Sequence, residues 1–236
     1  MTTMKDVEVF RGAVDDLSTL AVAETSTVLS QVSRFDASVQ RDTLIEVMPM
    51  LVTPMASAAI DLAREWFEES SPTALSLPAR NPLPSTESFA GLVFWALEPL
   101  FFPDKFDDPS SELILSRLTG RAQKTIADAA RGQTVSDVRA TPGTTWVRVN
   151  APGCCAWCVW LASLGNRYRT QSAASNYHDW CRCSAAPSFE GDSLDVAAKN
   201  DALGIVKSLT VDRPGNEGDT STKALLSNMR YDLGLK

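Results

Sequence analysis

Residues 153–168 read GCCAWCVWLASLGNRY and residues 177–189 read YHDWCRCSAAPSF, and these two segments decide what kind of fold surrounds them. They contain every cysteine of the 236-residue chain and its single histidine, His178. An odd number of thiols without a secretory signal does not suit a disulfide framework. Paired thiols beside a histidine in a reducing compartment are instead typical of a metal site. The cysteines are Cys154, Cys155, Cys158, Cys181 and Cys183.

The spacing of these residues predicts a structural zinc site. A CxxC pair allows two thiolates to bind one ion from a turn, and the following HxxCxC run can supply the other ligands. If that run is extended, its two cysteines point to the same side of the chain. More candidates are therefore present than the four ligands that tetrahedral zinc requires. The preferred ligands are Cys155, Cys158, His178 and one of Cys181 or Cys183, with Cys154 as the alternative to Cys155 in a shifted register.

Three other interpretations of the cysteine segments stay open. Free cysteines are often buried and inert, so the cluster could simply fill a core. A CxxC pair can be redox-active, although the βαβ unit that usually accompanies one is not visible in this sequence. A cysteine nucleophile with His178 as its base is the catalytic alternative, but one histidine cannot both bind zinc and act as a free base. We therefore assign no catalytic and no cofactor-binding residue.

The first half of the chain predicts helices. Apolar residues recur at steps of three and four over residues 13–48, which indicates one long helix or two with a break near residues 34–38. Pro49 and Pro54 predict a kink or a helix restart, and Gly132 predicts a helix end. Further helical stripes lie at residues 55–66, 89–97 and 113–129, the last of them with Asp108 and Pro109 as its expected start.

The pattern changes after Gly132. Residues 144–149 alternate and are rich in β-branched side chains, so they predict a strand, and residues 181–189 predict a second extended segment. We expect a mainly α member of the α+β class. Its parts are a helical domain over residues 1–135, a Cys/His α+β lobe over 136–192 and a C-terminal helical tail over 193–236. Shorter elements are expected at 155–164 (helix), 167–169 (strand), 193–209 (helix) and 221–233 (helix).

Composition narrows the class of protein. A net charge of −7 argues against a general nucleic-acid binder, so we expect no sequence-specific nucleic-acid binding. The most apolar stretch, residues 92–97, is too short to span a bilayer, and we expect no membrane partner. The N-terminus has no apolar signal core. These features predict a protein made and kept in a cytoplasm, or packed into a particle assembled there.

The two cysteine segments resemble the Cys/His region of MuF-like minor head proteins of tailed phages, most closely the type found in phages of actinobacteria. That pattern is CxxC, a short helix, a glycine turn with an aromatic residue, and HxxCxC leading into a strand. Residues 56–68 also resemble the alanine-rich helix near the start of such proteins. The likeness is specific over about forty residues and loose elsewhere. The matching positions are Cys155, Cys158, Gly165, Tyr168, His178, Cys181 and Cys183.

The resemblance implies a non-enzymatic minor capsid protein for head morphogenesis, associated with the portal or the inner capsid. Its expected partners are the portal, scaffold or major capsid protein, and its expected location is the inside of the virion head, after assembly in the host cytoplasm. The alternative is a capsid maturation protease, but Ser163, Ser172 or Ser175 would each need His178 as a base. A cytosolic zinc-binding adaptor unrelated to phages is the third interpretation.

Overall fold

The computed structural model describes residues 2–71, 79–107, 110–165 and 179–210. Within these residues the protein is mainly helical, with six α-helices, one short 3₁₀ helix and a two-stranded antiparallel sheet. The predicted α+β class is thus confirmed. The elements are α1 (Met4–Val32), α2 (Ala37–Ser70), α3 (Thr86–Phe101), η1 (Pro103–Lys105), α4 (Ser111–Ala140), β1 (Thr145–Val149), α5 (Ala156–Ser163), β2 (Ser184–Ser188) and α7 (Leu194–Thr210).

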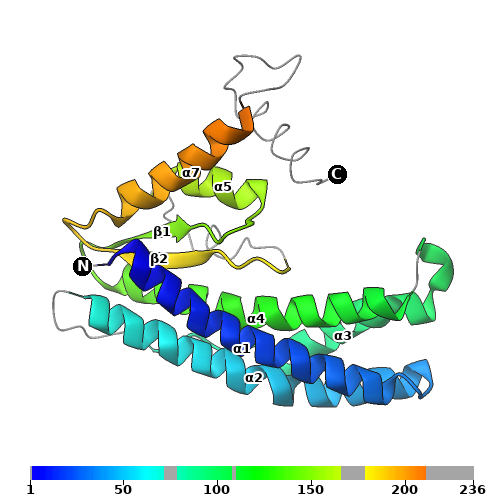
Figure 1. Cartoon of the computed structure of the whole chain (residues 1–236). Helices are drawn as coiled ribbons and strands as arrows, with labels where there is room; N and C mark the ends of the chain where they lie inside the picture. The colour runs from blue at the N-terminus through cyan, green and yellow to red at the C-terminus, as the bar shows by residue number, and fades with distance from the viewer. Residues whose placement is uncertain (1, 72–78, 108–109, 166–178, 211–236) are drawn as a thin grey trace.

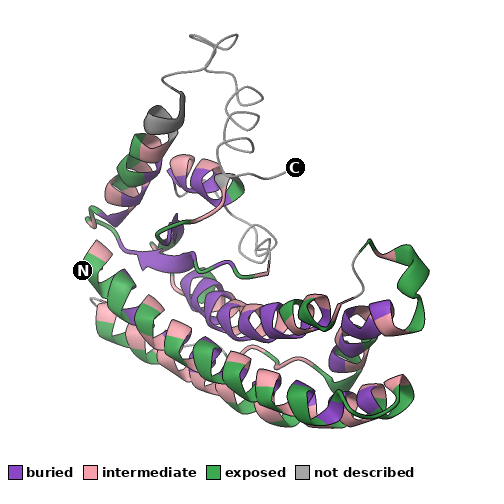
Figure 2. Ribbon diagram, turned by 45° about the vertical axis from the view of Figure 1, so that its right-hand side comes forward, coloured by how far each residue is buried: buried purple, intermediate pink, exposed green. Residues whose placement is uncertain are grey.

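Helices α1 to α4 form a bundle on one side of the sheet, and α5 and α7 cover the other side (Figure 1). Strands β1 and β2 pair antiparallel, with Val147 opposite Ala186 at the centre of the register. Helix α4 is the central element, and half of its 30 residues are buried (Figure 2). The division into domains at residues 135 and 192 stays a prediction, because α4 packs against both the bundle helices and the sheet.

The bundle core is built from the apolar stripes that the sequence predicts. Leu44, Met48 and Val52 on α2 are fully buried, and they pack in one cluster with Val93 of α3 and Leu118 of α4. Each of α1, α3 and α4 begins at a serine or threonine whose hydroxyl accepts a backbone N–H from the first turn. Such capping satisfies amide groups that a helix start leaves unpaired.

The helices differ from the predictions in two places. The break falls at residues 33–36, which overlaps the predicted interval of 34–38, but α2 then runs without restart through Pro49 and Pro54. The predicted end at Gly132 is wrong, because α4 continues to Ala140. A glycine costs a helix only about 1 kcal/mol, and the buried residues that follow, among them Val135 and Val138, offset that cost.

Other predicted boundaries fall partly outside the described residues. Helix α4 starts at Ser111 with Ser110 as its cap, so the predicted start with Asp108 as cap and Pro109 as first helical residue is wrong. Asp108 and Pro109 themselves lie outside the described residues. The strand expected at 167–169 and the helix expected at 221–233 also lie outside the described residues. The elements expected at 144–149, 155–164, 181–189 and 193–209 are confirmed as β1, α5, β2 and α7.

One described helix, α2, is long and apolar enough to cross a membrane by length and composition alone. The core helix of a helical bundle has the same properties, and the face of α2 that carries Ala56, Ala59 and Ala63 is fully buried against its neighbours. The expectation of no membrane partner stays a prediction.

Candidate metal centre

The sheet brings the two cysteine segments together. The chain leaves β1 through a turn at Ala151–Gly153, where Gly153 has a φ of +71° and Cys154 N–H donates to the Ala151 carbonyl at 3.1 Å. Glycine is favoured at such a left-handed position because it has no Cβ. This turn starts α5, whose first turn contains Cys158. Cys181 and Cys183 stand on the segment that leads into β2, which pairs with β1.

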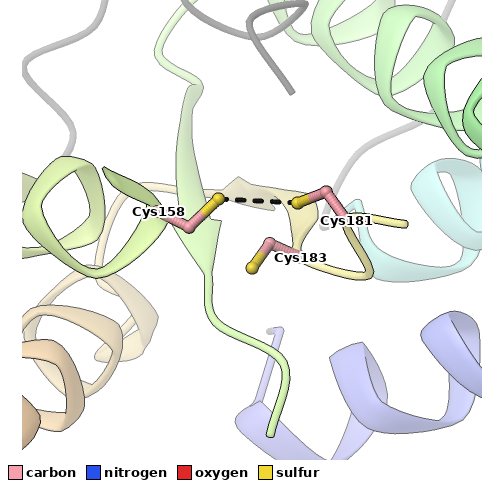
Figure 3. Close-up of side chains that lie close together, drawn as sticks. All are labelled: Cys158, Cys181 and Cys183. Atoms are coloured by element: carbon pink, nitrogen blue, oxygen red, sulfur yellow. Dashed lines mark hydrogen bonds between the residues drawn. The ribbon is translucent and has the colours of Figure 1, made fainter. Parts of the chain in front are cut away.

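Three buried cysteines lie close enough together to bind one metal ion. The Sγ atoms of Cys158, Cys181 and Cys183 all lie within 4.8 Å of one another, and those of Cys158 and Cys181 are 3.5 Å apart. Figure 3 shows the latter two facing each other between α5 and the segment before β2, with Cys183 beside them. Tetrahedral zinc with Zn–S bonds of about 2.3 Å would space its sulfur ligands roughly 3.8 Å apart. The donor set therefore fits a thiolate-bound metal, and all five cysteines are free thiols rather than disulfides.

N–H donors point at two of the clustered sulfur atoms. The Arg148 guanidinium donates to the Cys158 Sγ at 3.4 Å, and the Ala151 N–H points to the Cys183 Sγ at 3.5 Å. Arg148 is only 1% exposed, although arginine is almost never buried without a countercharge. N–H donors that meet sulfur stabilise its anionic form. A buried cation beside the Cys158 thiol would compensate part of the negative charge of a metal–thiolate centre.

Helix α4 holds the Cys181–Cys183 segment in place. The guanidinium of the buried Arg131 donates to the carbonyl of Cys181 at 2.6 Å and to that of Cys183 at 2.8 Å. Gln123 donates to the same Cys181 carbonyl at 3.1 Å, and Asp128 accepts from Arg131 at 2.9 Å. The fork geometry of arginine allows one side chain to bind both carbonyls. The backbone of Cys181 and the backbone of Cys183 are thus both held by hydrogen bonds from helix α4.

The residues around Cys181 dock on α1 and α4 as well. Trp180 adopts a φ of +65°, which is unusual for a bulky residue. A Cβ on Gly120 would lie 2.8 Å from the indole nitrogen of Trp180, so only glycine leaves room for this ring on α4. Asp179 pairs with Arg121 at 3.4 Å, and Arg182 pairs with Asp15 of α1 at 2.5 Å. This docking orients the cysteine segment from both sides.

The three thiols are electrostatically coupled. Hydrogen bonds with Cys155 and then Cys181 raise the pKa of the Cys158 thiol, and a hydrogen bond with Cys154 is the main cause that raises the pKa of Cys183. Hydrogen bonds from Cys158 and Cys183, aided by the charge of Arg131, lower the pKa of Cys181. One thiolate is therefore stabilised, whereas further ionisation among such close sulfurs requires an additional positive charge.

The predicted ligand residues divide into three groups. Cys158, Cys181 and Cys183 come together in the centre. Cys154 and Cys155 are half-buried and pack against this cluster. His178 lies outside the described residues, as do Ser172 and Ser175.

Sequence reasoning missed the supporting residues Arg131, Gln123 and Arg148. The signal for Arg148 was a charged residue inside an apolar strand, between Val147 and Val149. Arg131 and Gln123 gave no local signal, because each bonds a carbonyl at least 50 residues away along the chain. Ser163 donates to the carbonyl of Trp160 within its own helix at 2.7 Å, so its hydroxyl is not directed at a base.

Comparison with known proteins connects the chain to one family. The family model described as VG15 protein matches residues 1–204, which include the whole bundle, the sheet and all five cysteines. No characterised protein and no solved structure matches the chain. Because the match extends over most of its length, the chain belongs to the VG15 protein family.

Proposed function

We propose that this protein is a minor capsid protein of a tailed phage, which acts in head morphogenesis and whose cysteine lobe is stabilised by zinc. The observation that carries the proposal is the cluster of Cys158, Cys181 and Cys183. These residues belong to the CxxC and HxxCxC motifs that resemble MuF-like minor head proteins. The portal, scaffold or major capsid protein would be its partner. The protein would assemble in the host cytoplasm and remain inside the head.

Zinc is the metal that this donor set favours. Thiolate ligands select soft or borderline ions, and structural zinc sites use four ligands from cysteine and histidine. Cys158, Cys181 and Cys183 would supply three of them. The fourth would be Cys155, which already hydrogen-bonds Cys158, or His178. A four-ligand site is closed, so the ion would stabilise the lobe rather than activate water.

The metal part of the proposal is tested by metal analysis of the full-length protein purified under reducing conditions. We expect about one equivalent of zinc, and less than about half an equivalent would overturn the structural-zinc proposal. Cys154→Ser tests the shifted register, in which Cys154 replaces Cys155 as a ligand, and full zinc content in this variant would exclude that register. Loss of zinc from Cys155→Ser but not from His178→Ala would identify Cys155 as the fourth ligand.

The capsid part is tested with particles. Mass spectrometry of purified virions should detect the protein at low copy number, and its absence from virions would contradict the proposal. Co-expression with the scaffold and major capsid proteins tests the protease alternative. Cleavage that is lost in His178→Ala but survives metal removal would favour the enzyme over the structural protein. A portal gene upstream and a scaffold or capsid gene downstream would argue against the unrelated zinc adaptor.

A further inference from the structure

A groove runs between α1 and α2, at the end of the bundle where α1 begins and α2 ends. The two helices lie side by side and antiparallel, so the first turns of α1 face the last turns of α2 (Figure 1). The groove has a volume of about 450 Å³, within the range of sites that accept small ligands or a few side chains. We call it the α1–α2 groove. Its lining residues are Asp6, Val9, Phe10, Ala13, Leu62, Glu65, Trp66, Glu69 and Ser70.

The middle of the α1–α2 groove is aromatic and apolar. Phe10 and Trp66 stack across it, with ring centroids 4.3 Å apart and an angle of 15° between their planes. Val9 is 67% exposed beside them, whereas Val7 and Val14 of the same helix are buried. The lining residues recur at steps of three and four on both helices. That spacing offers a continuous ridge to a third helix lying along the pair.

The charged groups of the α1–α2 groove are all acidic. Asp6, Glu65 and Glu69 line it, and no lysine or arginine does among the described residues. None of the three carboxylates forms an ion pair within the described part of the chain. A hydrogen bond from the Thr3 hydroxyl lowers the pKa of Asp6, so this carboxylate is charged at neutral pH. Glu65 and Glu69 are one helical turn apart, where like charges repel, and a cation between them would relieve that repulsion.

We propose that the α1–α2 groove binds a basic amphipathic helix of another protein. The apolar side chains of that helix would cover Val9 and the partly exposed Leu62 and Trp66, while its lysine or arginine side chains would meet the carboxylates. The aliphatic stems of these basic residues can also lie along the aromatic rings. The charge complementarity selects a basic partner over an acidic or neutral one. The proposal depends neither on zinc nor on the capsid role, since the groove contains no residue of the cysteine cluster.

The test uses the full-length protein and a fluorescein-labelled peptide of lysine and leucine at helical spacing, about four turns long. The control peptide carries glutamate in place of every lysine. We expect fluorescence anisotropy to report saturable binding of the basic peptide only, with an affinity that falls as salt is added. Absence of binding, or equal binding of both peptides, would overturn the proposal.

Two double variants with the same net charge locate the peptide. Glu65→Lys with Glu69→Lys reverses two exposed charges in the groove, and Glu24→Lys with Glu46→Lys reverses two exposed charges elsewhere on the same helices. We expect the groove variant to weaken binding about tenfold and the control by less than about twofold. Equal weakening in both variants would overturn the site. Self-association of the unmodified protein that only the groove variant abolishes would show a second copy as the occupant, and would also overturn it.

Discussion

The bundle of α1–α4 and the cysteine lobe formed by β1, α5, β2 and α7 differ in how their buried residues are grouped. Within the described residues, the bundle has one large apolar cluster of 21 buried residues, contributed by all four helices. The buried residues of the lobe fall into separate small clusters of six, six, three and four, and the two clusters of six also include bundle residues such as Val7 of α1 and Phe67 of α2. A two-stranded sheet with so little continuous core is marginal by itself.

The buried polar groups of the lobe show what replaces the missing apolar area. Arg148 is among the largest fully buried side chains of the described residues, and it faces sulfur rather than carbon. Arg131 reaches from α4 to the backbone of the cysteine segment. The bundle is therefore stabilised by non-directional burial, whereas the lobe depends on a few directional contacts that converge on the thiols. Substitutions in the two regions should consequently fail in different ways.

Cys158→Ser should have the largest effect. It removes one of three clustered thiols, and structural zinc contributes about 10 kcal/mol or more of binding free energy to folding, so we expect a loss of more than about 3 kcal/mol. Because the bundle keeps its own core, far-ultraviolet circular dichroism should retain most of the helical signal while the lobe loses its tertiary signal in the near ultraviolet. A chelator added to the unmodified protein should reproduce both changes. An unchanged melting temperature would contradict the comparison.

Leu118→Ala is the corresponding change in the bundle. Leu118 is fully buried on α4 among the residues of the large apolar cluster, so truncation should cost about 3 kcal/mol through lost burial and the cavity left behind. Zinc content should stay at the level of the unmodified protein, since no cysteine belongs to this apolar cluster among the described residues. Denaturant unfolding and metal analysis of the same sample check both statements. Loss of zinc in this variant would show that the two regions do not fail separately.

Arg131→Lys tests the connection between the regions. Lysine keeps the charge but lacks the fork that binds the carbonyls of Cys181 and Cys183 together, so one carbonyl loses its buried donor. We expect a loss of about 2 kcal/mol in stability and about tenfold in zinc affinity. Arg139→Lys on the exposed end of the same helix is the matched control and should change neither. A competitive zinc titration separates the variants, and equal affinities would exclude a positioning role for Arg131.

The sequence predicts the regular parts of both regions from local patterns. Steps of three and four gave the helices of the bundle, and β-branched alternation gave β1. The predicted helix end at Gly132 is wrong because the burial of later residues in the tertiary structure keeps α4 helical to Ala140, and a local sequence pattern does not show that burial. Helix α4 starts where the Ser110 hydroxyl accepts the Leu113 N–H. Several nearby residues have side chains that can cap a helix in the same way, so the local sequence does not single out Ser110.

The candidate site was predictable only in part, for a physical reason. Thiols at metal-ligand spacing can be recognised in a sequence, and Cys158, Cys181 and Cys183 lie close together in the structure. Arg131 could not be predicted, since its partners are backbone carbonyls, which every residue possesses. The close approach of Trp180 to Gly120 likewise depends on how two distant segments dock. Residues that could bind a metal can be recognised by their spacing in the sequence, whereas the residues that orient them can be recognised only once the fold is known.

Asp137→Asn should change the stability least, and it should raise the stability where the other substitutions lower it. Asp137 is fully buried on α4, accepts from Gln133 at 2.9 Å through Oδ1, and its Oδ2 has no hydrogen-bond partner within the described part of the chain. Burial raises the pKa of this carboxyl, and the hydrogen bond from Gln133 and then the charge of Arg64 offset that rise only in part. The folded protein thus binds the proton more tightly than the unfolded chain, and the stability this provides is lost as pH rises through the folded pKa.

Asparagine removes the buried charge while keeping an acceptor for Gln133, so the variant should gain about 1 kcal/mol at neutral pH, or about 2 to 4 °C in melting temperature. The gain should vanish below about pH 3, where the carboxyl is protonated in both the folded and the unfolded state. Melting curves across this pH range check the sign, with Asp16→Asn on the exposed face of α1 as the control. A variant that is less stable at neutral pH would mean that the attraction between Asp137 and Arg64 outweighs the cost of burial. In that case the end of α4 nearest the sheet would depend on directional contacts as the lobe does.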